Sequence, residues 1–243
     1  MSDHSITSLI EKLEGAERRT YAIGDVHGRL DLLSQAFALI IDDAGERGAD
    51  VVCLGDYVDR GPDSKGVIDL LMSSPLRDRD TLVCLMGNHE QLMLGAATGC
   101  KASESCWMGN GGVQTAISYG SSIPADHLNW LSELPLLHQD AHRIYVHAGL
   151  MPGYGPDQQD PEWCLWIRDR FLREQGGWSK HVVHGHTPQW DGKPNATEPE
   201  CLAHRTNLDT GACWTGVLTV GVFDPNQAGG PISILRAQSE ARV

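Results

Sequence analysis

The chain has 243 residues, of which 41% are hydrophobic and 21% charged, and its formal net charge is −13. This length allows one or two domains with a full core, and the composition is ordinary for a globular protein. A chain this acidic should repel nucleic acids and anionic membranes, so we expect neither as a partner. Bound cations can still reverse the sign of the field at a phosphate site.

We expect neither a signal peptide nor a membrane span. Residues 1–14 have no basic segment followed by an apolar core, and no apolar run approaches the roughly 18 residues that a membrane helix needs. The seven cysteines are scattered, odd in number and never in a Cys-x-x-Cys pair, which favours reduced thiols over disulfides or a thiolate zinc site. The sequence therefore predicts a cytoplasmic protein without cysteine-based chemistry.

The first half of the chain alternates strand and helix patterns after a polar lead-in at 1–19. Apolar, strand-like runs at 19–23, 50–54 and 81–86 each stop at a glycine, and a helical spacing of apolar residues follows each of them. This β-α-β-α-β order predicts a largely parallel sheet covered by helices. In such sheets, ligands bind at the carboxyl ends of the strands.

The second half has fewer helical patterns. A glycine-rich loop is predicted at 109–112 and a helix at 126–137. We place the later strands in a second sheet, stacked on the first. With no linker or repeat between the halves, the sequence predicts a single domain over 1–243, an α/β fold of two stacked mixed β-sheets flanked by helices. The later strand-like runs are 143–146, 181–183, 205–208, 217–222 and 231–235.

Metal-ligand residue types follow the strands at five places. Neutral imidazoles together with carboxylate and amide oxygens suit divalent cations such as manganese, iron, zinc or cobalt. One carboxylate, such as Asp56, can bridge two ions, and a two-metal site supplies hydroxide at neutral pH and clamps the oxygens of a displacement. The residues at the strand ends are Asp25, His27, Asp56, Asn88, His89, His147 and His186.

Each of these residues also has a simpler interpretation. Asp25 or Asp56 could cap the helix that follows it, a lone histidine is more often a core or surface residue, and a Gly-Asp pair is commonly a turn. Five strand ends of this kind are hard to explain as caps, because a helix cap has no use for histidine. The sequence therefore predicts a two-metal site.

These residues lie in five ordered motifs that resemble those of the metallophosphoesterases. More narrowly, the motifs are similar to those of the phosphoprotein phosphatase family, the serine/threonine protein phosphatases. They run from 24 to 186, and Leu208-Asp-Thr-Gly211 resembles the family's closing strand. The five motifs are Gly24-Asp-Val-His-Gly28, Gly55-Asp-Tyr-Val-Asp-Arg-Gly61, Gly87-Asn-His-Glu90, His147-Ala-Gly149 and His184-Gly-His186.

The resemblance implies two divalent metal ions as cofactors, with Mn²⁺ first and Fe, Zn, Co or Ni as alternatives. It also implies the ligands. These are Asp25, His27 and Asp56 for one ion, and Asp56, Asn88, His147 and His186 for the other.

The resemblance further implies the catalytic and phosphate-binding residues. His89 would be the general acid that protonates the departing alkoxide, and Asp59 would orient it. Arg60 would bind the phosphate through its planar fork. Arg168 would be a second phosphate clamp, with an ion pair to a nearby carboxylate as an equal alternative.

Two substrate classes remain open. Asp59 and Glu90 favour a protein phosphatase, because the similar symmetrical diadenosine tetraphosphate hydrolases commonly have Ala and Asp there. A phosphoprotein or small phosphoester is thus the expected substrate, and no regulatory subunit is inferred. A metal-binding sensor or scaffold is disfavoured, because all ligand positions are intact. Met86 stands where some small members have Arg.

Trp107 and the segment from Asn110 to Gly112 lie between the third and fourth motifs. We interpret them as part of a loop over the site, with an ordinary packed loop as the alternative.

Overall fold

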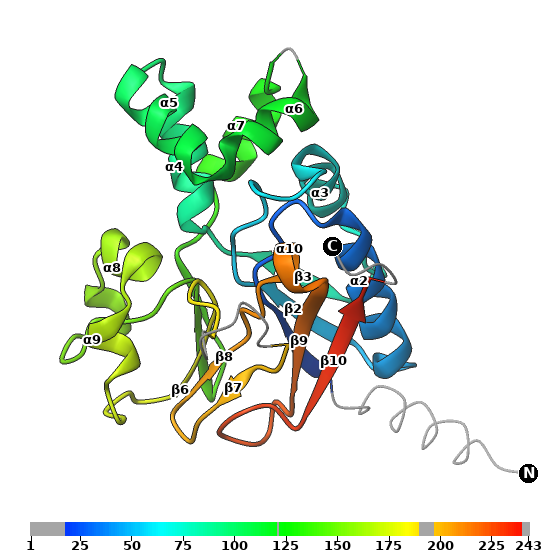
Figure 1. The fold of residues 1–243 in the computed structure, drawn as a ribbon. Coiled ribbons are helices and arrows are strands. Elements are labelled where there is room, and N and C mark those ends of the chain that lie inside the picture. Colours follow the sequence, from blue (N-terminus) through cyan, green and yellow to red (C-terminus); the bar gives the residue numbers. More distant parts are fainter. Residues whose placement is uncertain (1–17, 121, 190–196, 240–243) are drawn as a thin grey trace, which may run out of the picture.

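The computed structural model describes residues 18–120, 122–189 and 197–239, so nearly all of the predicted lead-in lies outside the described residues. Two five-stranded sheets are stacked face to face, with helices on their outer faces (Figure 1). The predicted α/β fold of two mixed sheets is confirmed. None of the helices in the described part of the chain is long and apolar enough to span a bilayer.

The first sheet has a parallel centre. Strands β1 (Arg19–Ile23), β2 (Ala49–Cys53) and β3 (Thr81–Cys84) lie side by side. Helices α2 (Leu30–Ala44) and α3 (Ser64–Met72) connect them and cover one face. The predicted β-α-β-α-β order is confirmed, and all three strands end at the same edge of the sheet.

Two late strands complete the first sheet, so their predicted place in the second sheet is wrong. β9 (Val217–Phe223) pairs antiparallel with β1, and β10 (Ser233–Gln238) pairs antiparallel with β9. β9 is buried along its whole length because its two faces enter different cores. Val220 and Val222 pack under the helices, whereas Phe223 lies between the sheets. A strand that is apolar on both faces belongs inside a sheet.

The second sheet has the order β4-β5-β6-β8-β7, with parallel pairing of β5, β6 and β8. Helices α8 and α9 cover its outer face, and α10 precedes β9 (Figure 1). The elements are β4 (Leu137–Gln139), β5 (Arg143–Val146), η2 (Pro156–Gln158), α8 (Pro161–Trp166), α9 (Asp169–Leu172), β6 (His181–His184), β7 (Glu200–Cys201), β8 (Arg205–Asn207) and α10 (Ala212–Thr215).

A core of apolar side chains joins the two sheets. Ala22 and Val52 face it from the first sheet, and Tyr145 and Val183 face it from the second. Because this core fixes one sheet against the other, residues at the strand ends of both sheets are held at one place.

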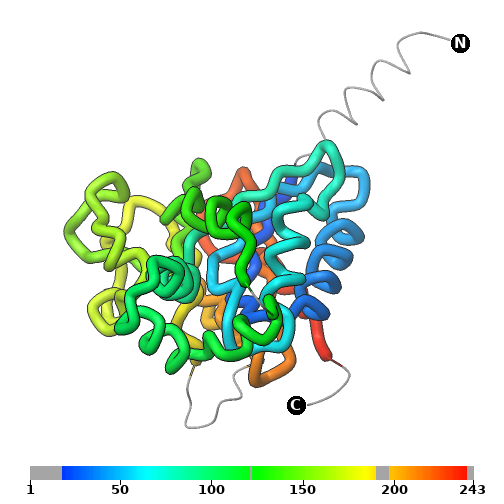
Figure 2. Tube along the Cα trace, turned by 90° about the horizontal axis from the view of Figure 1, so that it is seen from above, coloured from blue at the N-terminus to red at the C-terminus, as the bar shows by residue number. Residues whose placement is uncertain are grey.

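The segment between β3 and β4 forms a helical arm above the sheets (Figure 1). Viewed from above, the arm lies over the centre of the molecule (Figure 2). Its helices are α4 (Asn88–Ala97), α5 (Lys101–Trp107), the π-helical turn η1 (Met108–Gly112), α6 (Val113–Tyr119) and α7 (Ala125–Ser132).

Two secondary-structure predictions for this arm are wrong. The segment 109–112 is a helical turn rather than a loop, and only Gly111, at φ +106°, departs from helical geometry. The helix predicted over 126–137 ends at Ser132. Pro135 has no N–H for a further turn, so the chain extends into β4 instead.

Candidate metal centre

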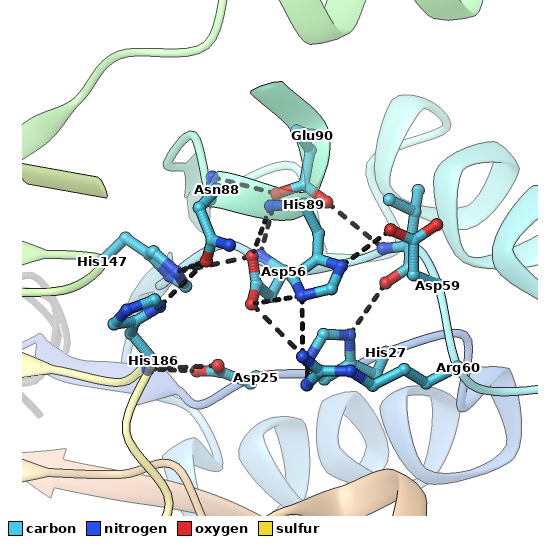
Figure 3. A network of polar contacts seen from close by, with 12 residues as sticks. Asp25, His27, Asp56, Asp59, Arg60, Asn88, His89, Glu90, His147 and His186 are labelled. Atoms are coloured by element: carbon cyan, nitrogen blue, oxygen red, sulfur yellow. Dashed lines mark hydrogen bonds and ion pairs between the residues drawn. The ribbon is translucent and has the colours of Figure 1, made fainter. Parts of the chain in front are cut away.

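The strand ends of both sheets converge on one buried cluster (Figure 3). The segments that follow β1, β2 and β3 contribute four of the six predicted ligands, with Asn88 as the first residue of α4, and the loops after β5 and β6 contribute two. None of the six is more than 5% exposed. They are Asp25, His27, Asp56, Asn88, His147 and His186.

Asp56 lies at the centre of this cluster. Its Oδ1 is 3.4 Å from His147 Nε2, and its Oδ2 is 3.5 Å from His27 Nε2. Two groups of candidate metal ligands share it, and within each group the ligand atoms lie within 4.8 Å of one another. One group contains His27 and His89, and the other contains His147 and His186. Asp56 is therefore placed to bridge two cations.

Asp25 joins neither group. Its two carboxylate oxygens accept the backbone N–H of His186, at 3.2 and 3.1 Å. A Cβ on Gly185 would lie 2.0 Å from Asp25 Oδ1, so this approach requires glycine. The contact explains why a Gly stands between the two histidines of the fifth motif.

The hydrogen bonds of two histidine rings leave a lone pair for a cation. Nδ1 of His27 donates to Val58 O at 2.8 Å, and Nδ1 of His147 donates to Leu54 O at 2.9 Å. Burial lowers the pKa of both imidazoles, that of His27 to about 3, so the lone pair lies on Nε2. Nε2 of His147 faces the amide oxygen of Asn88 at 2.9 Å. A bound cation would relieve this contact between two acceptors.

His186 offers a further free nitrogen. Its Nε2 is buried and has no hydrogen-bond partner among the described residues. Burial lowers the pKa of this imidazole to about 2, so the ring is neutral. A neutral imidazole with a free nitrogen is a good ligand for divalent transition metals.

Three buried carboxylates concentrate negative charge at the cluster. Burial, together with the charges of Asp209 and Asp56, raises the pKa of Asp25 well above its usual range. Burial also raises the pKa of Asp209 to about 6. At Asp56 the surrounding histidines outweigh burial and lower the pKa. Divalent cations would offset this repulsion, so the residues fit a metal centre by charge as well as by donor type.

The cluster also concentrates strained backbone. Five of the six non-glycine residues with positive φ in the described chain belong to it or lie directly beside it. Such conformations cost about 1–3 kcal/mol each and persist where the surrounding structure imposes them. They are His27, Asp56, Asp59, Arg60 and His186.

The helix-cap interpretation does not fit the structure. The N-cap residue of α2 is Arg29, which makes no side-chain cap hydrogen bond. The N-cap of α3 is Asp63, whose carboxylate accepts the N–H of Gly66. Neither Asp25 nor Asp56 therefore caps the helix that follows it.

His89 and Asp59 form a buried pair beside the cluster. Nδ1 of His89 donates to Asp59 Oδ2 at 2.7 Å, and both residues are at most 2% exposed. Burial lowers the pKa of His89, but the charge of Asp56 and the hydrogen bond to Asp59 outweigh it and raise this pKa. The guanidinium of Arg60 lies 2.8 Å from His89 Nε2 and 2.6 Å from His27 Nε2. The structure thus brings these three predicted residues together.

Arg168 lies at the rim, between α8 and α9. Its guanidinium is exposed and donates to the hydroxyl of Thr187 at 3.3 Å rather than to the neighbouring Asp169. Asp169 pairs instead with Arg173. The charge of Arg168 helps to lower the pKa of His186 and of His147, behind burial in both cases.

Glu90 has a structural part in the cluster that the sequence did not reveal. Its carboxylate is fully buried and accepts four backbone N–H groups, from residues 56, 57, 58 and 87, at 2.8–3.2 Å. Burial and the charge of Asp56 raise its pKa to about 8, against the pull of these donors. The Gly-Asn-His-Glu motif is the only sequence signal for it. Glu90 ties the loop after β2 to the start of α4.

Burial argues against nucleophilic chemistry at Cys164, which has the Cys-x5-Arg spacing with Arg170. Cys164 is 1% exposed on α8, and burial raises the pKa of its thiol to about 11. A nucleophilic cysteine needs a lowered pKa.

Comparison with known proteins identifies the family. The family model described as calcineurin-like phosphoesterase matches residues 18–213. The chain therefore belongs to the calcineurin-like phosphoesterases, and it is a metal-dependent phosphoester hydrolase.

Related enzymes have two different names. The chain is 28% identical over 215 residues to serine/threonine-protein phosphatase 1 of Salmonella typhimurium, covering 84% of this chain and 91% of that enzyme. It is 26% identical over 211 residues to the symmetrical bis(5'-nucleosyl)-tetraphosphatase of Janthinobacterium, covering 76% and 72%. It is 30% identical to the enzyme of that name from Nitrosospira multiformis, but the match spans only 46% of that enzyme.

Solved structures agree on the fold. One named as a candidate diadenosine tetraphosphatase superposes with a TM-score of 0.65 at 23% identity, covering 90% of this chain and 93% of that one. A serine/threonine phosphatase from Saccharomyces cerevisiae superposes with a TM-score of 0.56 at 14% identity, covering 98% and 89%. At these identities the likeness concerns the fold alone.

Proposed function

We propose that the protein is a serine/threonine protein phosphatase that hydrolyses phosphomonoesters with two divalent metal ions, Mn²⁺ first among them. Asp56 would be a ligand of both ions. The remaining proposed ligands are Asp25 and His27 for one ion, and Asn88, His147 and His186 for the other.

The observation that carries this proposal is the pair formed by His89 and Asp59. Hydrolysis of a phosphoserine or phosphothreonine expels an alkoxide, a poor leaving group that needs a proton as the bond to phosphorus breaks. A histidine held by a buried carboxylate at 2.7 Å is suited to deliver that proton. A polyphosphate leaving group is already a stable anion and has less need of an acid.

The protein's own residues have separate roles in the reaction. Arg60 and Arg168 hold the phosphate oxygens and stabilise the charge that spreads over them in the transition state. When bound, the two metals polarise the phosphoryl group and lower the pKa of water. Hydroxide attacks phosphorus, the bond from phosphorus to the serine or threonine oxygen breaks, and His89 gives its Nε2 proton to that oxygen. The products are inorganic phosphate and the free hydroxyl.

Symmetrical hydrolysis of diadenosine tetraphosphate is the second candidate. It is favoured by Trp214, whose indole is 48% exposed and lies under the Arg60 guanidinium, at 5.0 Å from its carbon to the ring centroid. A cavity of about 370 Å³ opens here, with Asn110 and Gln114 also in its wall. An exposed aromatic face beside a phosphate-binding arginine can stack a nucleobase.

Rates on three substrates test these two functions. The protein is purified, supplied with manganese, and assayed on a phosphothreonine peptide, on diadenosine tetraphosphate and on p-nitrophenyl phosphate. A higher kcat/KM on the peptide supports the proposal. A higher value on the dinucleotide replaces it with the second candidate, and activity on none of them revives a sensor or scaffold.

A further inference from the structure

The helical arm reaches into the site at Asp59. Three side chains donate to its carboxylate, although it lies in the loop after β2. One is His89 at the start of α4, and the other two, Trp107 from α5 and Thr115 from α6, come from further along the arm. Asp59 and Thr115 are fully buried, and Trp107 is 4% exposed. Both donors from the arm therefore contact the carboxylate away from bulk water.

The contacts from the arm are short and specific. Nε1 of Trp107 donates to Asp59 Oδ1 at 2.9 Å and to Oδ2 at 3.1 Å. The hydroxyl of Thr115 donates to Oδ1 at 2.7 Å and also lies 2.8 Å from the backbone N–H of Asp59, which it accepts. Oδ2 therefore remains directed at His89, and the left-handed backbone of Asp59, at φ +72°, is held from two sides.

The glycines between these two residues make the approach sterically feasible. A Cβ on Gly112 would lie 2.7 Å from the indole of Trp107, and a Cβ on Gly111 would lie 2.7 Å from Cγ of Arg60. Gly111 also accepts the backbone N–H of Arg60 through its carbonyl, at 3.1 Å. The segment from Trp107 to Thr115 is thus fitted around Asp59 and Arg60, and the sequence indicated only that Trp107 and the residues from Asn110 to Gly112 lie in a loop over the site or in an ordinary packed loop.

We propose that Trp107 and Thr115 are positioning residues for acid catalysis, which hold the Asp59 carboxylate so that it directs the His89 ring at the leaving group. They do not touch the substrate. The shorter contacts of Trp107 and Thr115 are both with Oδ1, and Oδ2, which Trp107 reaches at 3.1 Å, accepts His89 Nδ1–H at 2.7 Å. This fixes both the rotation of the carboxylate and the ring nitrogen that carries the transferable proton.

The proposal rests on the proposed phosphomonoester function and predicts a dependence on the leaving group. An alkoxide needs the proton from His89, whereas p-nitrophenolate leaves as a stable anion without it. General acid catalysis contributes about 10²–10⁴-fold. We expect Trp107→Phe and Thr115→Val to lower kcat/KM on a phosphothreonine peptide about 10- to 100-fold. On p-nitrophenyl phosphate, we expect a change within about threefold, because that step bypasses the acid.

Three controls separate positioning from a general loss of structure. Thr115→Ser keeps the hydroxyl and should recover most of the peptide activity. Trp178→Phe removes an indole N–H that has no partner among the described residues, and it should leave both rates unchanged. Manganese content should stay at the wild-type value in every variant. Equal losses on both substrates, or no loss on either, would overturn the proposal.

A measurement without substrate distinguishes failure of this inference from failure of the proposed function. The His89 Nδ1 proton should give a downfield NMR signal in the wild type that broadens by exchange in Trp107→Phe and Thr115→Val. An unchanged signal refutes the positioning role, whatever the substrate is. If the wild type does not cleave the peptide, the protein phosphatase function fails, but the NMR result still decides the role of the arm.

Discussion

Two regions of the molecule build the site in different ways. The loops after the strands of the two sheets supply five of the six proposed metal ligands, and the sixth, Asn88, is the first residue of α4, a few residues beyond β3. The helical arm supplies Trp107 and Thr115, which reach Asp59 across 48 and 56 residues of sequence. The strand ends thus provide the charged chemistry, and the arm fixes one carboxylate within it.

This difference decides what the sequence can reveal. Ligands at strand ends follow from topology, because parallel strands end at one edge and bring their loops together. Residue type and position were therefore enough to predict seven candidate residues that the structure brings together, and the family resemblance selected six of them as the proposed ligands. The contacts of the arm depend on a π-helical turn broken at Gly111, and no periodic pattern predicts such a turn.

The largest expected effect comes from the centre of the strand-end region. Asp56→Asn removes the carboxylate that two candidate ligand groups share, so we expect metal content to fall from about two ions per chain towards zero. Activity should fall about 10³-fold or more, because metal stabilisation of transition-state charge is worth several kcal/mol. Elemental analysis of the purified variant measures the ions. Asp69→Asn, at a half-exposed position on α3, is the control and should keep its metal. Two tightly held ions in Asp56→Asn would contradict a shared role for Asp56.

His89→Asn separates acid catalysis from metal binding. Turnover of a phosphothreonine peptide should fall about 10²–10⁴-fold while both metals remain. The wild-type kcat should fall as pH rises through the pKa of His89. This pKa lies above its usual value, because the charge of Asp56 and the hydrogen bond to Asp59 outweigh burial. The protonated acid therefore persists to higher pH, and the variant should lack this alkaline limb. Loss of metal from His89→Asn would instead make His89 a ligand, since it lies within one of the two ligand groups.

The fold shows the same difference between features that local sequence predicts and features that distant contacts determine. The β-α-β-α-β half was predictable because its strands and helices alternate locally. The sheet to which β9 belongs was not predictable, because the apolar pattern of this strand suits either sheet. Only its pairing with β1 places it in the first sheet. The segment 109–112 was interpreted as a loop because glycines usually mark one, but tertiary contacts with Arg60 and Trp107 hold it as a helical turn.

Glu90→Gln tests the link between the two regions. The side-chain amide that replaces one carboxylate oxygen would face backbone N–H donors, so at least one buried donor loses its acceptor. We expect a loss of roughly 1–3 kcal/mol in the free energy of unfolding. Denaturant unfolding of the metal-free protein measures it, with the exposed Glu133→Gln as the matched control. Unchanged stability would mean that the four amides do not depend on a carboxylate.

The smallest expected effect concerns the cavity beside Arg60, where the arm meets α10. Trp214→Leu removes the exposed indole under the guanidinium, a contact worth about 0.5–1 kcal/mol at an exposed site. KM for a phosphothreonine peptide should therefore rise only about two- to fivefold. Stacking of a nucleobase is worth about 1–3 kcal/mol, so a much larger rise confined to diadenosine tetraphosphate would show that Trp214 holds a base.

Tyr154→Leu, at an equally exposed aromatic position, should change neither KM, because Tyr154 packs on Trp163 away from Arg60. A selective effect on the dinucleotide would assign this cavity to the second candidate function, whereas equal small effects on both substrates would leave Trp214 as a support for Arg60 alone.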